Sequence, residues 1–182
     1  MRTYDNAELT RIVNEYKARR KQNPDTHIDN CLNQPTLADA VEVAAKAVNA
    51  KGKMNHHQRR VGQAALDVFA ANLKGFVKQL SAATTFDQIH DIVAKAATDR
   101  IGELVIYDTA QRIGCYKNVF PDKVYLHTGT RTGARKLLGK LKNNRELRMD
   151  ELPGPLAQLT PDEVENVFCI YKDKMAGCVM NP

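Results

Sequence analysis

The sequence predicts an almost wholly helical protein, folded as a single compact all-α domain over residues 1–182. Apolar residues recur at spacings of three and four along most of the chain, which is the period of a helix with one buried face. Only the short stretch Lys123–His127 looks extended. With 182 residues, 43% of them hydrophobic, the chain is long enough to bury a core. We therefore expect about seven or eight helices.

The first strong helix start lies at Thr36, directly after Pro35. The Thr36 hydroxyl can cap the backbone amide of Asp39, three residues further on. The apolar stripe that follows consists of Leu37, Val41, Ala44 and Val48. A longer stripe with the same spacing consists of Leu66, Phe69, Leu73, Phe76, Val77 and Leu80.

Two later helix starts also carry capping signals. Thr85 is followed by Gln88, and the stripe behind it consists of Phe86, Ile89, Ile92, Val93 and Ala96. The run Thr160–Glu163 (TPDE) opens the stripe Val164, Val167, Phe168 and Tyr171. Between the helices, we expect loops at residues 22–26, 51–53, 120–122 and 152–155.

The composition favours a cytoplasmic protein that does not enter a membrane. No apolar run approaches the roughly 18 residues that a membrane span needs, and the first residues contain no signal-peptide core. The four cysteines, at positions 31, 115, 169 and 178, are scattered, so no disulfide framework is indicated. No metal site or cofactor is expected, because the histidines form no metal-binding spacing.

Positive charge is concentrated in residues 123–148, which we call the basic segment. Its one acid is Glu146, and its Lys and Arg residues are Lys123, Arg131, Arg135, Lys136, Lys140, Lys142, Arg145 and Arg148. Such a concentration favours a polyanionic partner, although a merely solvated surface is the alternative.

A helical hairpin is predicted at residues 86–116. The first helix is expected to end near Asp99 and Arg100, Ile101–Glu103 to form a tight turn, and the second helix to run over Leu104–Gly114. A glycine turn followed by a helix N-terminus can hold a phosphate without reading bases. The alternative is that Gly102 only allows one core helix to turn into the next.

The hairpin resembles that of the helix-hairpin-helix DNA glycosylases, over residues 86–138. Ile101, Gly102, Ala110 and Arg112 stand at matching steps, and Val124–His127 corresponds to the extended segment that ends in the family's catalytic aspartate. The chain also resembles a broad bacterial group of uncharacterised proteins, which share segments like 57–60, 107–114, 125–131 and 169–172. The first resemblance implies duplex DNA as partner and excision of a modified or damaged base as activity.

The sequence departs from the glycosylase pattern at three positions. Arg100 replaces the first turn glycine, Leu104 stands where lyase members have their Schiff-base lysine, and His127 replaces the catalytic aspartate. An apolar residue cannot attack the sugar, so lysine-based lyase activity is not expected. A neutral histidine can act as a base but lacks the aspartate's standing negative charge.

The candidate catalytic residues are therefore His127 and Asp108, an acid one turn into the second helix of the predicted hairpin. His127 can instead cap a helix or bind a loop carbonyl, and Asp108 can instead pair with Arg112 four residues on. Tyr107 and Tyr125 can stack on a base, although core packing explains at least one of them equally well.

The remaining candidates are DNA-backbone contacts. Gly129–Arg135 looks like a loop that leads into a helix, and its glycines, hydroxyls and arginines suit phosphate oxygens. The predicted contacts are Arg100, Ile101, Gly102, Glu103, Gly129, Thr130, Arg131, Thr132, Gly133, Arg135, Lys136, Arg59 and Arg60. Two hypotheses remain open: a monofunctional DNA glycosylase-like enzyme, and a non-catalytic module for DNA or protein binding on the same scaffold.

Overall fold

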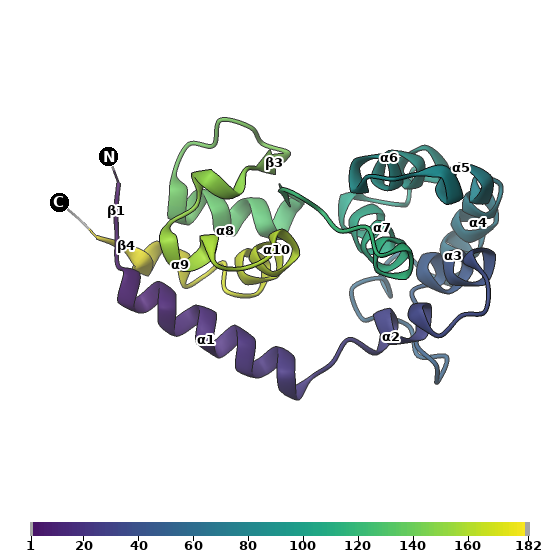
Figure 1. Cartoon of the computed structure of the whole chain (residues 1–182), viewed down its shortest axis with the longest axis horizontal. Coiled ribbons are helices and arrows are strands. Elements are labelled where there is room, and N and C mark those ends of the chain that lie inside the picture. The colour runs from purple at the N-terminus through teal and green to yellow at the C-terminus, as the bar shows by residue number, and fades with distance from the viewer. Residues whose placement is uncertain (1, 181–182) are drawn as a thin grey trace. The chain divides into compact units, whose positions relative to one another are not determined.

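The computed structural model describes residues 2–180 and is mostly helical, with 61% of residues in helices (Figure 1). The prediction of a mostly helical chain is confirmed, but the described residues form ten α-helices rather than the seven or eight expected. Two compact units are found: unit 1 comprises residues 2–24 and 122–180, and unit 2 comprises residues 25–121. Within the described residues, no helix is long and apolar enough to cross a membrane. That the units fold as one domain stays a prediction.

Unit 2 is one continuous stretch of chain that folds into six helices. Figure 1 shows them packed together. They are α2 (Thr26–Leu32), α3 (Leu37–Lys46), α4 (Gln63–Lys74), α5 (Val77–Ala82), α6 (Phe86–Ala96) and α7 (Glu103–Lys117). Helix α7 packs against α2, α3 and α6, so it forms the centre of the unit. The long stripe from Leu66 to Leu80 is divided between α4 and α5.

The predicted capping signals are confirmed at two helices of unit 2. The Thr36 hydroxyl accepts a hydrogen bond from the Asp39 amide at 3.2 Å and begins α3. Thr85 and Gln88 form a reciprocal capping box that begins α6. Each such cap satisfies backbone groups that a helix end otherwise leaves without partners, a contribution of about 1 kcal/mol.

Unit 1 joins the two ends of the described chain. Its elements are β1 (Thr3–Tyr4), α1 (Asn6–Gln22), β2 (Val124–Tyr125), α8 (Thr128–Leu138), β3 (Glu146–Leu147), η1 (Met149–Glu151), α9 (Gly154–Ala157), α10 (Pro161–Ile170), η2 (Met175–Cys178) and β4 (Val179–Met180). Strand β1 pairs antiparallel with β4, with Thr3 opposite Met180, and β2 pairs antiparallel with β3, with Val124 opposite Leu147. The predicted extended stretch at 123–127 is thus confirmed at β2.

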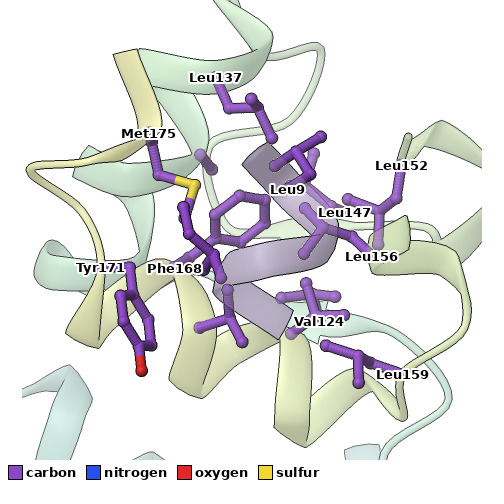
Figure 2. Packing of buried hydrophobic residues seen from close by; sticks show 14 of the residues in the cluster. Leu9, Val124, Leu137, Leu147, Leu152, Leu156, Leu159, Phe168, Tyr171 and Met175 are labelled. Carbon is purple, nitrogen blue, oxygen red and sulfur yellow. The ribbon is translucent and has the colours of Figure 1, made fainter. Parts of the chain in front are cut away.

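The core of unit 1 draws on segments distant in sequence (Figure 2). Leu9 of α1, Val124 of β2, Leu137 of α8 and Phe168 of α10 are all fully buried. Met175 of η2 joins them. Burial of each such side chain contributes roughly 1.5–3 kcal/mol, so this core attaches α1 to the C-terminal elements.

Candidate functional site

His127 lies at the start of α8 and is buried, with 4% of its surface exposed. Its Nε2 contacts the Glu165 carboxylate in a short hydrogen bond. The same nitrogen lies 2.8 Å from the Thr130 hydroxyl, one turn into α8. The Thr130 hydroxyl in turn donates to Glu165 Oε1 at 2.8 Å. Three buried polar side chains therefore form a closed triangle of hydrogen bonds.

Cys169 completes this group from α10. Glu165 and Cys169 are four residues apart on that helix, so they share one face. The ligand atoms of His127, Glu165 and Cys169 all lie within 4.8 Å of one another. We call His127, Thr130, Glu165 and Cys169 the His127 cluster. His127 and Glu165 are buried, whereas Cys169 is only half-buried.

The carboxylate that contacts His127 is that of Glu165, which the sequence reasoning missed. The two residues are 38 positions apart, and no local spacing connects them. The available signal was weak: Glu165 adjoins the apolar stripe that begins at Val164, so it lies at the edge of the buried face of the predicted helix. Cys169 was missed for the same reason, since it lies on α10 with Glu165. Thr130 stands only three positions after His127, but it was predicted to contact phosphate rather than His127.

Asp108 belongs to unit 2 and has its own partners there. Its carboxylate accepts a hydrogen bond from the Gln58 side-chain amide at 2.6 Å and lies 3.8 Å from the Arg112 guanidinium. The pairing with Arg112, weighed above as the alternative to a catalytic role, is thus present. Arg112 is itself buried and also donates to the Ala44 carbonyl of α3 at 3.3 Å. These contacts give Asp108 a role in the packing of unit 2.

The prediction of a loop at Gly129–Arg135 is wrong, because α8 already begins at Thr128. Helices α8 and α10 pack closely, as Figure 1 also shows. A Cβ atom on Gly133 would lie 2.2 Å from the Phe168 carbonyl oxygen, and one on Gly129 would lie 3.0 Å from Cys169 Sγ. Both glycines therefore serve the approach of two helices rather than a turn. Thr130 faces the same interface and is fully buried.

The cations of α8 contact carbonyl groups, an amide and a carboxylate of unit 1. Arg131 donates to the Leu126 carbonyl at 2.6 Å and to the Asn144 carbonyl at 2.7 Å. Arg135 donates to the Asn144 side chain at 3.1 Å, and Lys136 forms an ion pair with Asp173 at 2.7 Å. The exposed Thr132 hydroxyl donates to a backbone carbonyl of its own helix.

Acidic residues within the basic segment and directly after it pair with several of its cations. Ion pairs join Lys123 to Glu146, Lys142 to Glu151, and Arg148 to Asp150. Lys140 and Arg145 are exposed, and neither forms an ion pair within residues 2–180. Unit 1 still has sixteen Lys and Arg against eleven Asp and Glu, whereas unit 2 has eleven against ten. Unit 1 therefore carries almost all of the net charge of +6.

The connection between α6 and α7 differs in detail from the predicted turn. Helix α6 ends at Ala96, earlier than expected, and the Ile101 amide donates to the Thr98 carbonyl at 2.8 Å. Glu103 is already the first residue of α7, and Gly102 precedes it with a φ of −86°, which any residue can adopt. Arg100, Gly102 and Glu103 are exposed, while the Ile101 side chain is buried. A helix-hairpin-helix motif at this place stays a prediction.

The other predicted contacts divide between surface and core. Arg59 and Arg60 are exposed in unit 2. Tyr107 is buried and packs at a tilt against Phe86, with 6.0 Å between ring centroids, so core packing explains it. Tyr125 is half-buried in β2, and the Lys123 ammonium lies 5.6 Å from its ring centroid. Of the two tyrosines, only Tyr125 has a partly accessible ring.

No family model matches the chain, and no curated protein or solved structure matches it at a significant level. The resemblance to the helix-hairpin-helix glycosylases therefore stays a prediction.

Proposed function

We propose that this protein binds the DNA backbone through the basic segment of unit 1. The observation that carries the proposal is the concentration of net positive charge in that unit. Lys140 and Arg145 are exposed without an acidic partner in the described residues, and Arg135 is exposed beside Asn144. Phosphate contacts of this kind dominate DNA affinity and carry no sequence information.

The ion pairs of the basic segment are compatible with this role. The side chains of Lys142 and Arg148 are 87% and 77% exposed, so their pairs with Glu151 and Asp150 are screened by water. Exposed pairs of this type contribute little to stability, and a phosphate can replace the carboxylate at small cost. Lys142 and Arg148 therefore remain available to a polyanion.

The geometry of His127 favours the non-catalytic form of the hypothesis. A histidine that acts on a sugar must reach it, but this imidazole is 4% exposed and its Nε2 contacts Glu165 and Thr130. Its surroundings favour a role in joining α8 to α10. We therefore infer a DNA-binding module, with base excision as the second candidate.

A pair of matched triple variants tests the proposal. In the first, Arg135, Lys140 and Arg145 of unit 1 are replaced by Gln; in the second, Arg59, Arg60 and Arg100 of unit 2 are replaced by Gln. Each removes three exposed charges. The affinity for a short duplex is measured by fluorescence anisotropy at several salt concentrations. We expect the first variant alone to flatten the plot of log K against log salt, by about 2 to 3 in slope.

Equal loss in both variants, or loss only in the second, would contradict the assignment to unit 1. Absence of duplex binding by the unmodified protein even at low salt would exclude DNA as the partner, because phosphate contacts strengthen as salt falls.

One observation supports base excision. The Glu165 carboxylate contacts His127, at the position where the glycosylase pattern has its catalytic aspartate. Incubation with duplexes that carry alkylated, oxidised, deaminated or glucosylated bases tests this candidate. Abasic product that disappears in His127→Ala, while DNA binding persists, would establish it. No product across the panel, with DNA binding intact, would exclude it.

A further inference from the structure

We propose that His127, Glu165 and Cys169 bind a divalent transition-metal ion of the zinc type. The inference is independent of DNA binding, because it concerns the buried cluster and not the basic surface. It goes beyond the sequence, which shows no metal-binding spacing: the three residues come from two helix regions that only the packing of α8 on α10 brings together.

The donor set determines the class of metal. Imidazole nitrogen, thiolate sulfur and carboxylate oxygen together suit Zn²⁺, Co²⁺ and Ni²⁺, whereas Mg²⁺ and Ca²⁺ prefer oxygen ligands only. The three ligand atoms lie within 4.8 Å of one another. Ligands around a tetrahedral zinc ion, at bond lengths of about 2.0–2.3 Å, are separated by roughly 3 to 4 Å. The largest separation in the cluster therefore exceeds the upper end of this spacing by no more than about 1 Å.

Charge balance supports the same conclusion. A Glu165 carboxylate and a Cys169 thiolate together carry two negative charges, and a neutral His127 adds none. A divalent cation makes the group neutral, which matters because His127 and Glu165 are buried, with side chains 4% and 6% exposed. Charge in such a place is costly unless it is compensated.

The surroundings provide an entry side and a supporting hydrogen bond. Cys169 is the half-buried member, so the ion would enter beside its sulfur. Gly129 leaves that sulfur room, since a Cβ there would lie 3.0 Å from it. The Thr130 hydroxyl donates to Glu165 Oε1 at 2.8 Å and can orient the carboxylate, as outer-shell partners of metal sites do. Three protein ligands leave a fourth position for water or another small ligand.

Cobalt substitution provides the test. Purified protein is stripped with chelator and titrated with Co²⁺. We expect one equivalent to produce a near-ultraviolet thiolate-to-cobalt charge-transfer band and the visible bands of tetrahedral Co²⁺, both displaced by Zn²⁺. Cys169→Ser is expected to lose the charge-transfer band, and Glu165→Gln to weaken binding by about 100-fold. Thr130→Val is expected to weaken it by roughly 10-fold.

Cys115→Ser is the matched control, because Cys115 is a half-buried thiol in unit 2, outside the His127 cluster. It should keep both bands and the affinity. Circular dichroism of each metal-free variant separates loss of ligand from loss of fold. Alkylation of Cys169 gives a second readout, since bound Zn²⁺ should slow it and Mg²⁺ should not.

A charge-transfer band that persists in Cys169→Ser, or one that never forms in the folded protein, would overturn the proposal. So would Zn²⁺ that fails to slow alkylation of Cys169. In these cases the cluster is a hydrogen-bond network only. The duplex-binding assay above is unaffected by either result, so failure of the metal site and failure of the proposed function remain distinguishable.

Discussion

The two units of this protein bury polar side chains in different ways and carry different net charge. Unit 1 holds an acid, an imidazole and a thiol where α8 and α10 meet, and it has an excess of five positive charges. Unit 2 holds the Arg112 guanidinium within α7, beside Asp108 and Gln58, and has an excess of one. The hairpin that most resembled a DNA-binding motif therefore lies in the nearly neutral unit.

This difference shows that a segment that resembles a DNA-binding motif and the positive charge that DNA binding requires need not lie in the same unit. The α6–α7 connection leads into the N-terminus of α7. Its one cation, Arg100, is close in sequence to two acids, Asp99 and Glu103, which offset its charge. In unit 1, by contrast, Lys140 and Arg145 extend from a segment that has no acidic partner for them in the described chain. Affinity for phosphate depends on the local electrostatic potential, and not on the geometry of the turn alone.

The largest expected effect concerns the close helix crossing of unit 1. Gly133→Ala would place a Cβ 2.2 Å from the Phe168 carbonyl oxygen, and because that atom belongs to backbone, α10 must shift. We expect a loss of about 3 kcal/mol in unfolding free energy, the upper end of the usual cost of overpacking, measured by urea denaturation. Gly177→Ala, where no atom lies within 4 Å of the added Cβ, should change it little. Equal stability of the two variants would show that the helices are not in contact at Gly133.

The next effect concerns the buried cation of unit 2. Arg112→Met removes the hydrogen bond to the Ala44 carbonyl and the ion pair with Asp108, while it keeps most of the side-chain volume. We expect a loss of about 2 kcal/mol in thermal or urea unfolding. Arg148→Met, which removes the exposed pair with Asp150, should have little effect. An unchanged stability of Arg112→Met would mean that apolar packing alone maintains α7.

The smallest effect depends on pH. Hydrogen bonds from Lys46, and then from Lys74 of the neighbouring helix α4, hold the pKa of Glu42 at about 2, below its usual 4.5. A lowered pKa means that the pairing stabilises the fold above pH 4.5 and is lost as pH falls toward about 2. We expect Glu42→Gln to cost less than about 1 kcal/mol at pH 7, because the pair is partly exposed to water.

The measurement for this prediction is the difference in unfolding free energy between Glu42→Gln and the unmodified protein, followed from pH 7 down to pH 2. The difference should shrink across that window. Asp91→Asn is the control, because the Asp91 side chain is exposed and forms no ion pair within residues 2–180. A difference for Glu42→Gln that stays constant with pH would exclude the carboxylate charge as its cause.

Local features of the fold were predictable because their causes are local. The Thr85–Gln88 capping box and the Thr160–Glu163 box both form as predicted. Helix ends were less predictable. Helix α6 ends at Ala96, although residues 97–99 contain no glycine or proline that would indicate a helix end. Gly129 and Gly133 were wrongly predicted to lie in a loop, because glycine in a loop and glycine at a helix crossing look identical in sequence.

The sequence by itself determined the helical character, the helix starts at Thr36, Thr85 and Thr160 and the position of the basic segment, since each depends on residues within a few positions of one another. The starts of α1 and α2, which Asp5 and Asp25 cap, were not predicted. Only the tertiary structure decided that His127 meets Glu165 and Cys169, and that Asp108 meets Gln58. These contacts depend on which helix faces pack together. Burial of apolar surface drives that packing, and because the hydrophobic effect is not directional, it does not specify which polar side chains come into contact. The polar partners of each candidate residue were therefore set by the packing of helices distant in sequence.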